Sequence, residues 1–272
     1  MSKLEETINL LRNNQTKLLD CKELLAVLED YKTLKGLDKQ PEINVTETFN
    51  IGGVEFTMVK VNGGSFMMGC DDKESYSDEQ PANKVTLDSY YIGSTPVTQV
   101  LWKSVMGNNP SYFKGEKLPV EQVSWKDCQE FIKKLNQLTG KQFKLPTEAE
   151  WEFAARGGNC SNGYKYAGSN NLEEVGWYWG NCNSQTYPVG EFKPNELGLY
   201  DMSGNVYEWC QDWYGGYRVE SQSNPTGSAT GSCRVIRGGS WRTSAGGCRV
   251  SDRHFHVPTY RNDFIGFRLA LQ

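Results

Sequence analysis

Residues 197–209 read Leu-Gly-Leu-Tyr-Asp-Met-Ser-Gly-Asn-Val-Tyr-Glu-Trp, and residues 237–241 read Arg-Gly-Gly-Ser-Trp. Both stretches combine glycine with tryptophan. Gly238 and Gly239 permit a positive φ and a close approach of another chain segment, because glycine has no Cβ. Buried aromatic rings contribute large apolar areas, so we expect four tryptophans to be core anchors: Trp125, Trp151, Trp209 and Trp241. With 28 Gly, 8 Trp and 14 Tyr in 272 residues, the composition favours a loop-rich fold over a helical bundle.

The segment that follows the second stretch has an unusual composition. Residues 242–264 contain no Lys, Glu, Gln, Met or Trp, although the rest of the chain uses all five. These are the residue types that no codon ending in a pyrimidine encodes. The segment has neither the period of a strand nor that of a helix, and it holds both histidines of the chain, His254 and His256. This pattern predicts a surface that is built to vary in sequence.

Two helices are predicted upstream from their end signals. Ser124 and Asp127 form a capping box before an apolar helical face that ends at Gly140. Thr147 and Glu150 form a second capping box, and a glycine pair ends that helix. The middle of the chain therefore contains two main helices.

Strands are predicted before these helices. Residues 54–61 alternate in polarity as a strand does, and Asn-Gly-Gly at 62–64 predicts a hairpin turn into a second strand at 65–68. Residues 84–92 are predicted to form another single strand.

The N-terminal part differs from the rest. Residues 1–36 show two short apolar stripes at helical spacing, which predict a helical segment. It is either a hairpin that packs on the main domain or an arm for oligomerisation or docking. Residues 37–48 are polar and are expected to be a linker, so the main domain is predicted to span 49–272.

Composition limits the classes of function. A net charge of −4 and a pI of about 5.4 give no general attraction to nucleic acid. The eight cysteines include no Cys-x2-Cys spacing, which argues against a zinc ribbon, and both disulfides and buried free thiols stay open. The first residues lack the apolar region of a signal peptide, and we expect no membrane span.

Seven stretches together resemble the formylglycine-generating enzyme (sulfatase-modifying factor) family. They occur in the family's order, at 63–69, 96–98, 119–125, 145–152, 197–209, 237–241 and 266–268. The resemblance implies a C-type lectin-like fold of class α+β. We therefore expect a loop-rich domain with short twisted antiparallel sheets, two main helices and the additional N-terminal helical segment.

The same family resemblance raises the questions of enzymatic activity and of metals. Its oxidases hold copper between two cysteines in a Cys-x4-Cys arrangement, but here Thr243 stands near the first position and only Cys248 is present. The related sulfoxide synthases use three iron-binding histidines, whereas this chain has two. We therefore predict no enzymatic activity and no required cofactor. The family often binds calcium near the positions of Asn205 and Glu208, which makes these two residues a candidate calcium site. The alternatives are a turn bond for Asn205 and an arginine partner for Glu208.

A branch of this family resembles the chain more specifically, namely the variable proteins of diversity-generating retroelements. Their pattern places fixed blocks, here 237–241, 248–253 and 265–270, around positions that are rewritten. The resemblance implies a non-enzymatic, sequence-diversified ligand-binding protein, and the family precedent implies surface display. A fixed-specificity binding or accessory module is the alternative, and a copper- or iron-dependent oxidase is the third.

On this interpretation the ligand is a protein or a surface glycan, and the side chains between the fixed blocks contact it. The expected contact residues are Arg242, Thr243, Ser244, Gly246, Gly247, Asp252, His254, Phe255, His256, Val257, Tyr260, Arg261, Asn262, Asp263 and Phe264. Phe255, Tyr260 and Phe264 are the expected hot spots, because rigid aromatic rings bury area at low entropic cost. Arg249 and Arg253 are expected to form structural ion pairs or backbone bonds.

Overall fold

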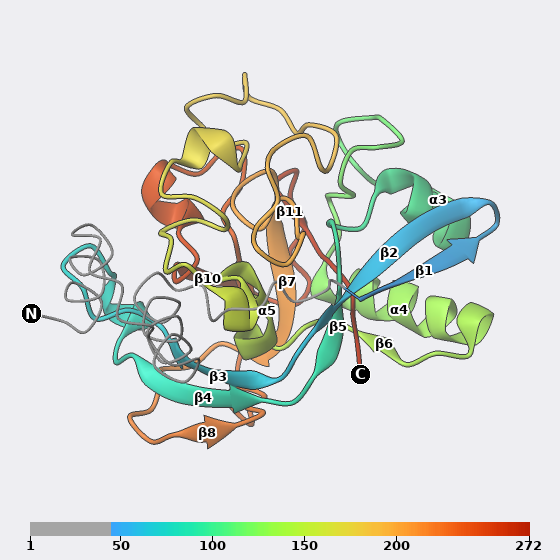
Figure 1. Ribbon diagram of the computed structural model, residues 1–272. Coiled ribbons are helices and arrows are strands. Elements are labelled where there is room, and N and C mark those ends of the chain that lie inside the picture. The colour runs from blue at the N-terminus through green and yellow to red at the C-terminus, as the bar shows by residue number, and fades with distance from the viewer. Residues whose placement is uncertain (1–44) are drawn as a thin grey trace, which may run out of the picture. The chain divides into compact units, whose positions relative to one another are not determined.

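The computed structural model describes residues 45–272 (Figure 1). The predicted helical segment 1–36 and most of the predicted linker lie outside the described residues. The first strand, β1, begins at Thr46. Residues 46–48, which we expected to belong to the linker, are therefore part of the domain, because they pair with the next strand.

The largest sheet has five strands in the order β1-β2-β5-β12-β6, and all its neighbours are antiparallel. Its strands are β1 Thr46–Ile51, β2 Val54–Val61, β5 Tyr90–Gly93, β12 Ala270–Leu271 and β6 Phe143–Lys144. The last strand, β12, thus lies between β5 and β6, which come much earlier in the chain, and is found near the C-terminus in Figure 1.

Two smaller sheets complete the domain. The order β10-β9-β7-β11 joins β10 Arg253–His256, β9 Arg234–Arg237, β7 Tyr207–Trp213 and β11 Ile265–Gly266. The order β3-β4-β8 joins β3 Gly64–Met68, β4 Asn83–Leu87 and β8 Gln222–Ser223. β11 runs parallel to β7, and β8 runs parallel to β4, so the expectation of purely antiparallel sheets is wrong for these two pairs.

The predicted hairpin at 54–68 is also wrong. β2 pairs with β1 and β5, whereas β3 pairs with β4 in another sheet. The predicted single strand at 84–92 likewise splits into β4 and β5. The reason is a close approach at the junction, where a Cβ on Gly63 would lie 2.6 Å from the carbonyl oxygen of Leu87. Two chain segments cross there, and each continues into a different sheet.

Three α-helices lie within the described range: α3 Gln99–Met106, α4 Trp125–Thr139 and α5 Glu148–Ala155. Both predicted capping boxes are confirmed at the starts of α4 and α5, and Gly140 ends α4 in the left-handed conformation. The sequence interpretation missed α3, which Thr98 caps by accepting a hydrogen bond from the Leu101 amide. Short 3-10 helices span Ser77–Glu79, Gly158–Cys160, Leu172–Glu174 and Ala245–Cys248.

The core consists of clusters around the predicted anchors. Trp209 packs in one cluster with residues of α3, α4 and the five-stranded sheet, and Trp151 packs in another with residues of β2 to β5. Both side chains are fully buried, and Trp241 is 7% exposed. Trp125 is only half-buried; it packs against the edge of the first cluster, and Arg234 lies over its ring, 4.0 Å from the centroid. Three of the four expected anchors are thus confirmed.

The structure also bears on the state of the cysteines and on the expectation of no membrane span. All seven cysteines between residues 45 and 272 are free, and four of them are buried. This agrees with the buried-thiol alternative for the described part of the chain. No helix formed by residues 45–272 combines the length and the apolar character that crossing a membrane requires.

Candidate functional site

The predicted variable segment, residues 242–264, falls into three parts. A loop with the 3-10 helix Ala245–Cys248 comes first. A buried block, residues 248–253, follows it. β10 and the loop that leads to β11 complete the segment, and β10 pairs with β9.

The two arginines of the buried block form ion pairs, as predicted. Arg249 donates from its two terminal nitrogens to Glu79, over 2.6 and 2.7 Å. Arg253 donates from Nε and Nη2 to Glu148, over 2.8 and 2.6 Å. Burial alone would raise the pKa of Glu79, but the hydrogen bonds from Arg249, the Tyr76 amide and Ser251, together with the charge of Arg249, outweigh it, and the pKa is lowered. Such two-point contacts hold the block against the rest of the domain.

Arg237, from the fixed stretch that opened the sequence analysis, holds the same block through its backbone. Its Nη1 donates to the carbonyl oxygens of Ser251, over 2.8 Å, and of Asp252. The guanidinium also pairs with Glu152, and both side chains are fully buried. The glycines after it adopt the predicted positive φ, 95° at Gly238 and 72° at Gly239. A Cβ on Gly239 would lie 2.5 Å from the Cys248 sulfur, so the close approach predicted for this pair is present.

Most of the fifteen expected contact residues reach the surface. The exposed ones are Arg242, Ser244, His254, Phe255, Val257 and Arg261, and the half-buried ones are Thr243, Gly246, His256, Tyr260, Asn262, Asp263 and Phe264. Gly247 and Asp252 are buried, which corrects their assignment to the contact surface. A Cβ on Gly247 would meet the Thr243 side chain at 2.4 Å, and the Asp252 carboxylate faces Arg249 at 3.8 Å.

Aromatic rings form a row across the third part of the segment. The rings of His256 and Tyr260 stack at 4.0 Å between centroids, and His254 lies 5.4 Å from His256. Phe264 lies 6.5 Å from Tyr260. Burial is the main cause that lowers the pKa of both histidines. Phe255 points to the other side of β10 and packs on a different tyrosine, so the three expected hot spots do not form one group.

The backbone of the variable segment is held by residues outside it. Besides Arg237, five donors outside the segment bond its carbonyl groups: the Trp179 amide to Thr243 (3.1 Å), the Lys126 amide to Pro258 (3.3 Å), the Gln122 amide to Asn262 (2.9 Å), the Trp241 indole to Asp263 (2.9 Å) and the Tyr207 amide to Phe264 (2.8 Å). These bonds use main-chain oxygens within the segment, so they do not depend on its side chains.

Three exposed aromatic residues outside the segment border it, and the sequence interpretation missed them. We call Tyr76, Tyr112 and Trp179 the aromatic rim; they are 54%, 67% and 74% exposed. Trp179 bonds the loop at Thr243, as described above. A Cβ on Gly246 would lie 3.4 Å from the Tyr76 hydroxyl. Tyr112 packs on Phe113, whose ring contacts Trp241. No local pattern marks them, because their position at the segment depends on tertiary contacts.

The candidate calcium residues have protein partners. Glu208 accepts hydrogen bonds from Arg268 on both oxygens, over 2.7 and 2.8 Å, and from the Trp151 indole over 2.6 Å. Arg268 is therefore the arginine partner that the alternative expected for Glu208. Asn205 bonds both the amide and the carbonyl of Tyr187, which agrees with the turn-bond alternative. With a guanidinium on both carboxylate oxygens, this arrangement does not fit a calcium ion.

The positions that carry copper in the oxidases are occupied differently here. The Thr243 hydroxyl accepts a hydrogen bond from the Ser240 amide at 3.1 Å. Cys248 is fully buried, and burial raises the pKa of its thiol. Metal ligation requires the thiolate form, and a single sulfur cannot supply the two-thiolate site.

Comparisons with known proteins agree with this geometry. Residues 53–272 match the family described as the sulfatase-modifying factor enzyme 1-like domain. The chain belongs to this family. "Chaperone protein LppX" of Paenibacillus barcinonensis is 37% identical over 244 residues, which cover 71% of this chain and 81% of LppX. The formylglycine-generating enzyme of Streptomyces coelicolor is 38% identical over 173 residues, covering 56% of this chain and 52% of the enzyme.

The solved structure of Treponema denticola variable protein 1 is similar along nearly its whole length. It matches with a TM-score of 0.79 and 37% sequence identity, covering 84% of this chain and 99% of that protein. The predicted α+β class, the C-type lectin-like fold and the resemblance to variable proteins are thereby confirmed. The chain is thus similar both to a named enzyme and to a named variable protein, so the site must distinguish between these roles.

Proposed function

We propose that this protein is a non-enzymatic, sequence-diversified ligand-binding protein, in which residues 242–264 present changeable side chains on a fixed frame. One observation carries the proposal. Donors outside the segment bond its main-chain oxygens, while thirteen of the fifteen expected contact residues have side chains or backbone at the surface. A loop held in this way keeps its path when its outward side chains change, as a paratope does on its framework.

Ion pairs made by the outward side chains contribute little to the stability of the domain. Arg242 meets Asp263 at 3.3 Å, and Arg261 meets Asp127 at 2.7 Å; both arginine side chains are more than half exposed. Exposed pairs of this kind contribute about 0–1 kcal/mol to stability. Their loss during diversification is therefore tolerable, whereas loss of the buried pairs is not.

The aromatic rim supplies a constant part to the proposed contact surface. Tyr76, Tyr112 and Trp179 lie outside 242–264 and would stay the same while that segment changes. Tyrosine and tryptophan are enriched among residues that dominate binding energy. We propose a protein or a surface glycan as ligand, contacted by the changeable side chains in the centre and by the rim at the edge.

The absence of catalysis is supported by Thr243 and Cys248, which replace the two-cysteine copper site. The similarity to variable protein 1 and to LppX, whose names are not those of enzymes, agrees with it. An oxygen-consumption assay with a cysteine-containing peptide and added copper tests this part. We expect no peptide-dependent oxygen uptake; turnover would establish the oxidase alternative.

A display library tests the binding proposal directly. Codons for the outward residues Arg242, His254, His256, Val257 and Arg261 are randomised, and the library is selected against lysozyme as a model protein ligand. In the matched library, five exposed positions far from the segment are randomised. We expect binders from the first library only. Equal recovery from both would contradict the proposal.

Diversification and surface display need separate tests. A near-identical template repeat and a reverse transcriptase gene beside the coding sequence would support diversification. Their absence would favour the fixed-specificity binding or accessory module, which the similarity to a protein named a chaperone also suggests. Labelling of intact cells with an antibody to this domain tests surface display.

A further inference from the structure

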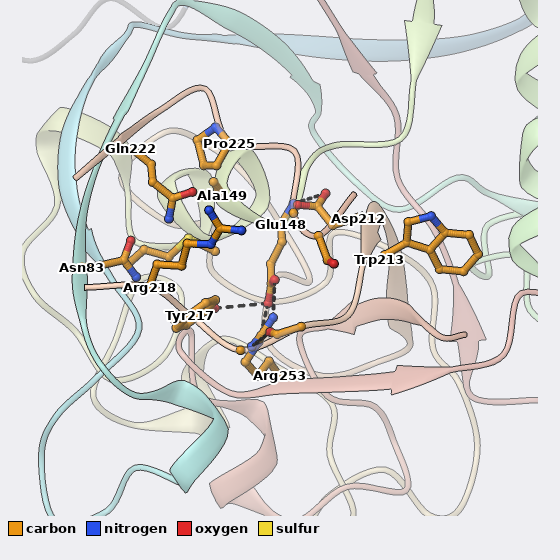
Figure 2. Close-up of a pocket in the computed structure, with 15 residues that line it drawn as sticks. Asn83, Glu148, Ala149, Asp212, Trp213, Tyr217, Arg218, Gln222, Pro225 and Arg253 are labelled. Carbon is orange, nitrogen blue, oxygen red and sulfur yellow. Dashed lines mark hydrogen bonds and ion pairs between the residues drawn. The ribbon is translucent and has the colours of Figure 1, made fainter. Parts of the chain in front are cut away.

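A second candidate site lies in a cavity that contains none of the fifteen expected contact residues. It has a volume of about 200 Å³ and is lined by residues of β3, β4, α5, β7, β8 and β10 and of the loops that follow β7 (Figure 2). A cavity of about 150 Å³ holds one benzene molecule. This cavity therefore has room for one six-membered ring with small substituents.

Some of the polar groups in this cavity already have partners. Glu148 accepts from Arg253 on both oxygens and from the Tyr217 hydroxyl over 3.2 Å (dashed lines in Figure 2). Arg253 also donates to the carbonyl oxygens of Asp78 and Gly215. Glu148, Arg253 and Tyr217 thus bind one another and form one wall of the cavity.

Other polar groups lack partners. Asn83 is 1% exposed, yet its Oδ1 has no hydrogen-bond partner among the described residues. Arg218 is exposed and forms no ion pair within the range 45–272. In Figure 2 both side chains lie at the same end of the cavity as Gln222. A buried acceptor without a donor costs free energy, and an unpaired cation attracts an anion. These two groups are complementary to a ligand that has both a hydroxyl group and a negative charge.

The other end of the cavity holds Asp212, which is 3% exposed and accepts a hydrogen bond from the Glu148 amide at 2.9 Å. Burial, together with the charges of Glu148 and Glu150, raises its pKa to about 8, while Arg253 acts in the opposite direction. Arg234 of β9 also faces this carboxyl group. At neutral pH Asp212 is therefore protonated and donates a hydrogen bond. The remaining charges of the lining sum to one positive charge, that of Arg218.

We propose that this cavity binds a small hydroxylated carboxylate of the size of one six-membered ring, such as a sugar acid. Arg218 pairs with the carboxylate, Asn83 Oδ1 accepts from a ligand hydroxyl, and Asp212 donates to a ligand oxygen. The shared chemistry fits both a free anion and the acidic end of a glycan. The lining takes only Arg253, from the buried block, out of residues 242–264, so the proposal does not rest on the function proposed for that segment.

Calorimetric titration with three matched probes tests the site. Glucuronate has the ring, the hydroxyls and the carboxylate; glucose lacks the carboxylate, and cyclohexanecarboxylate lacks the hydroxyls. We expect glucuronate to bind at least tenfold more tightly than either of the others, since a charge-assisted hydrogen bond contributes about tenfold in affinity. No binding of glucuronate at millimolar concentration, or equal binding of all three, would overturn the proposal. An oligosaccharide ending in glucuronate then distinguishes a glycan end from a free anion.

Two variants make the test specific. Arg218→Gln is expected to weaken glucuronate binding about tenfold, whereas Lys103→Gln, at an exposed position on α3, leaves it unchanged. Asp212→Asn keeps a donor at every pH. Wild-type affinity should therefore fall about tenfold between pH 7 and 9, and that of Asp212→Asn should not. Unchanged binding by Arg218→Gln, or the same pH response in both proteins, would contradict the assignment.

Discussion

Two neighbouring parts of residues 242–264 differ in almost every physical respect. The central block 248–253 is buried and holds charged side chains in paired contacts with Glu79 and Glu148. In the flanking part, from His254 to Phe264, every residue is exposed or half-buried. The change occurs between adjacent residues, because Arg253 is 5% exposed and His254 is exposed. One short segment thus contains a block that is fixed in the domain and a part that is open to a ligand.

This difference shows that position in the chain does not define what can vary. Successive side chains of a strand point to opposite faces, and β10 uses this alternation at Arg253 and His254. The fixed frame therefore includes every buried residue of the segment, among them Gly247 and Asp252. The following predictions test where the boundary lies.

The largest effect is expected when a buried arginine of the central block is removed. Arg249→Met leaves Glu79 buried without its partner, and such losses cost about 3–5 kcal/mol. Denaturant unfolding followed by fluorescence measures this loss. The control is Arg261→Met, which breaks an exposed pair and should cost about 1 kcal/mol or less. Similar costs for both variants would remove the distinction between frame and surface.

An intermediate effect is expected at Asp252, which we had assigned to the contact surface. Burial is the main cause that raises its pKa from 3.8 to about 7. The folded protein therefore keeps a proton that the unfolded chain loses above pH 4, and this contribution to stability disappears as the pH rises through 7. Asp252→Asn has no such proton to lose.

Between pH 5 and pH 8 we expect the unfolding free energy of wild type to fall, relative to that of Asp252→Asn, by on the order of 2 kcal/mol. Denaturant unfolding at several pH values measures the difference. Asp263→Asn, in the outward-facing part, is the control and should follow the wild-type profile. If the two variants behaved alike, Asp252 would not belong to the frame.

The smallest effect is expected from changes to the outward side chains. Arg242→Ser, His254→Tyr, His256→Asn and Val257→Thr combined in one protein should shift Tm by less than about 4 °C, since surface substitutions change stability little. Calorimetry gives the Tm, and the spectrum of selected ligands should change at the same time. A large drop in Tm would show that the flanks, too, are part of the frame.

Local signals predicted those parts of the fold that local contacts determine. The capping boxes at Ser124 and Thr147 and the positive φ of Gly238 and Gly239 depend on a few neighbouring residues, and all are present. The split of 84–92 between two sheets was not predictable, because it depends on where Gly63 crosses Leu87. Helix α3 has the same length as α5 but was missed, because Leu101 and not an acidic residue stands at the third position after Thr98, so that no capping box marks its start.

The candidate surface was predictable to a similar extent. Composition located the variable segment, and the family resemblance supplied its fixed blocks. The burial of Gly247 and Asp252 depends on Thr243 and Arg249 in three dimensions, which the sequence does not display. The aromatic rim comes from three distant loops, so only the fold brings Tyr76, Tyr112 and Trp179 to the same border.

The position of strand β12 determines what happens to a chain that is truncated or frameshifted within residues 242–264. It lies after residue 264 and joins β5 to β6 inside the five-stranded sheet. A chain that stops or shifts its reading frame within 242–264 lacks this strand, and β6 then has no partner in the sheet. If the segment is diversified as proposed, such a product is expected to unfold and to be removed by proteases, whereas substitutions alone leave the strand in place and change the specificity.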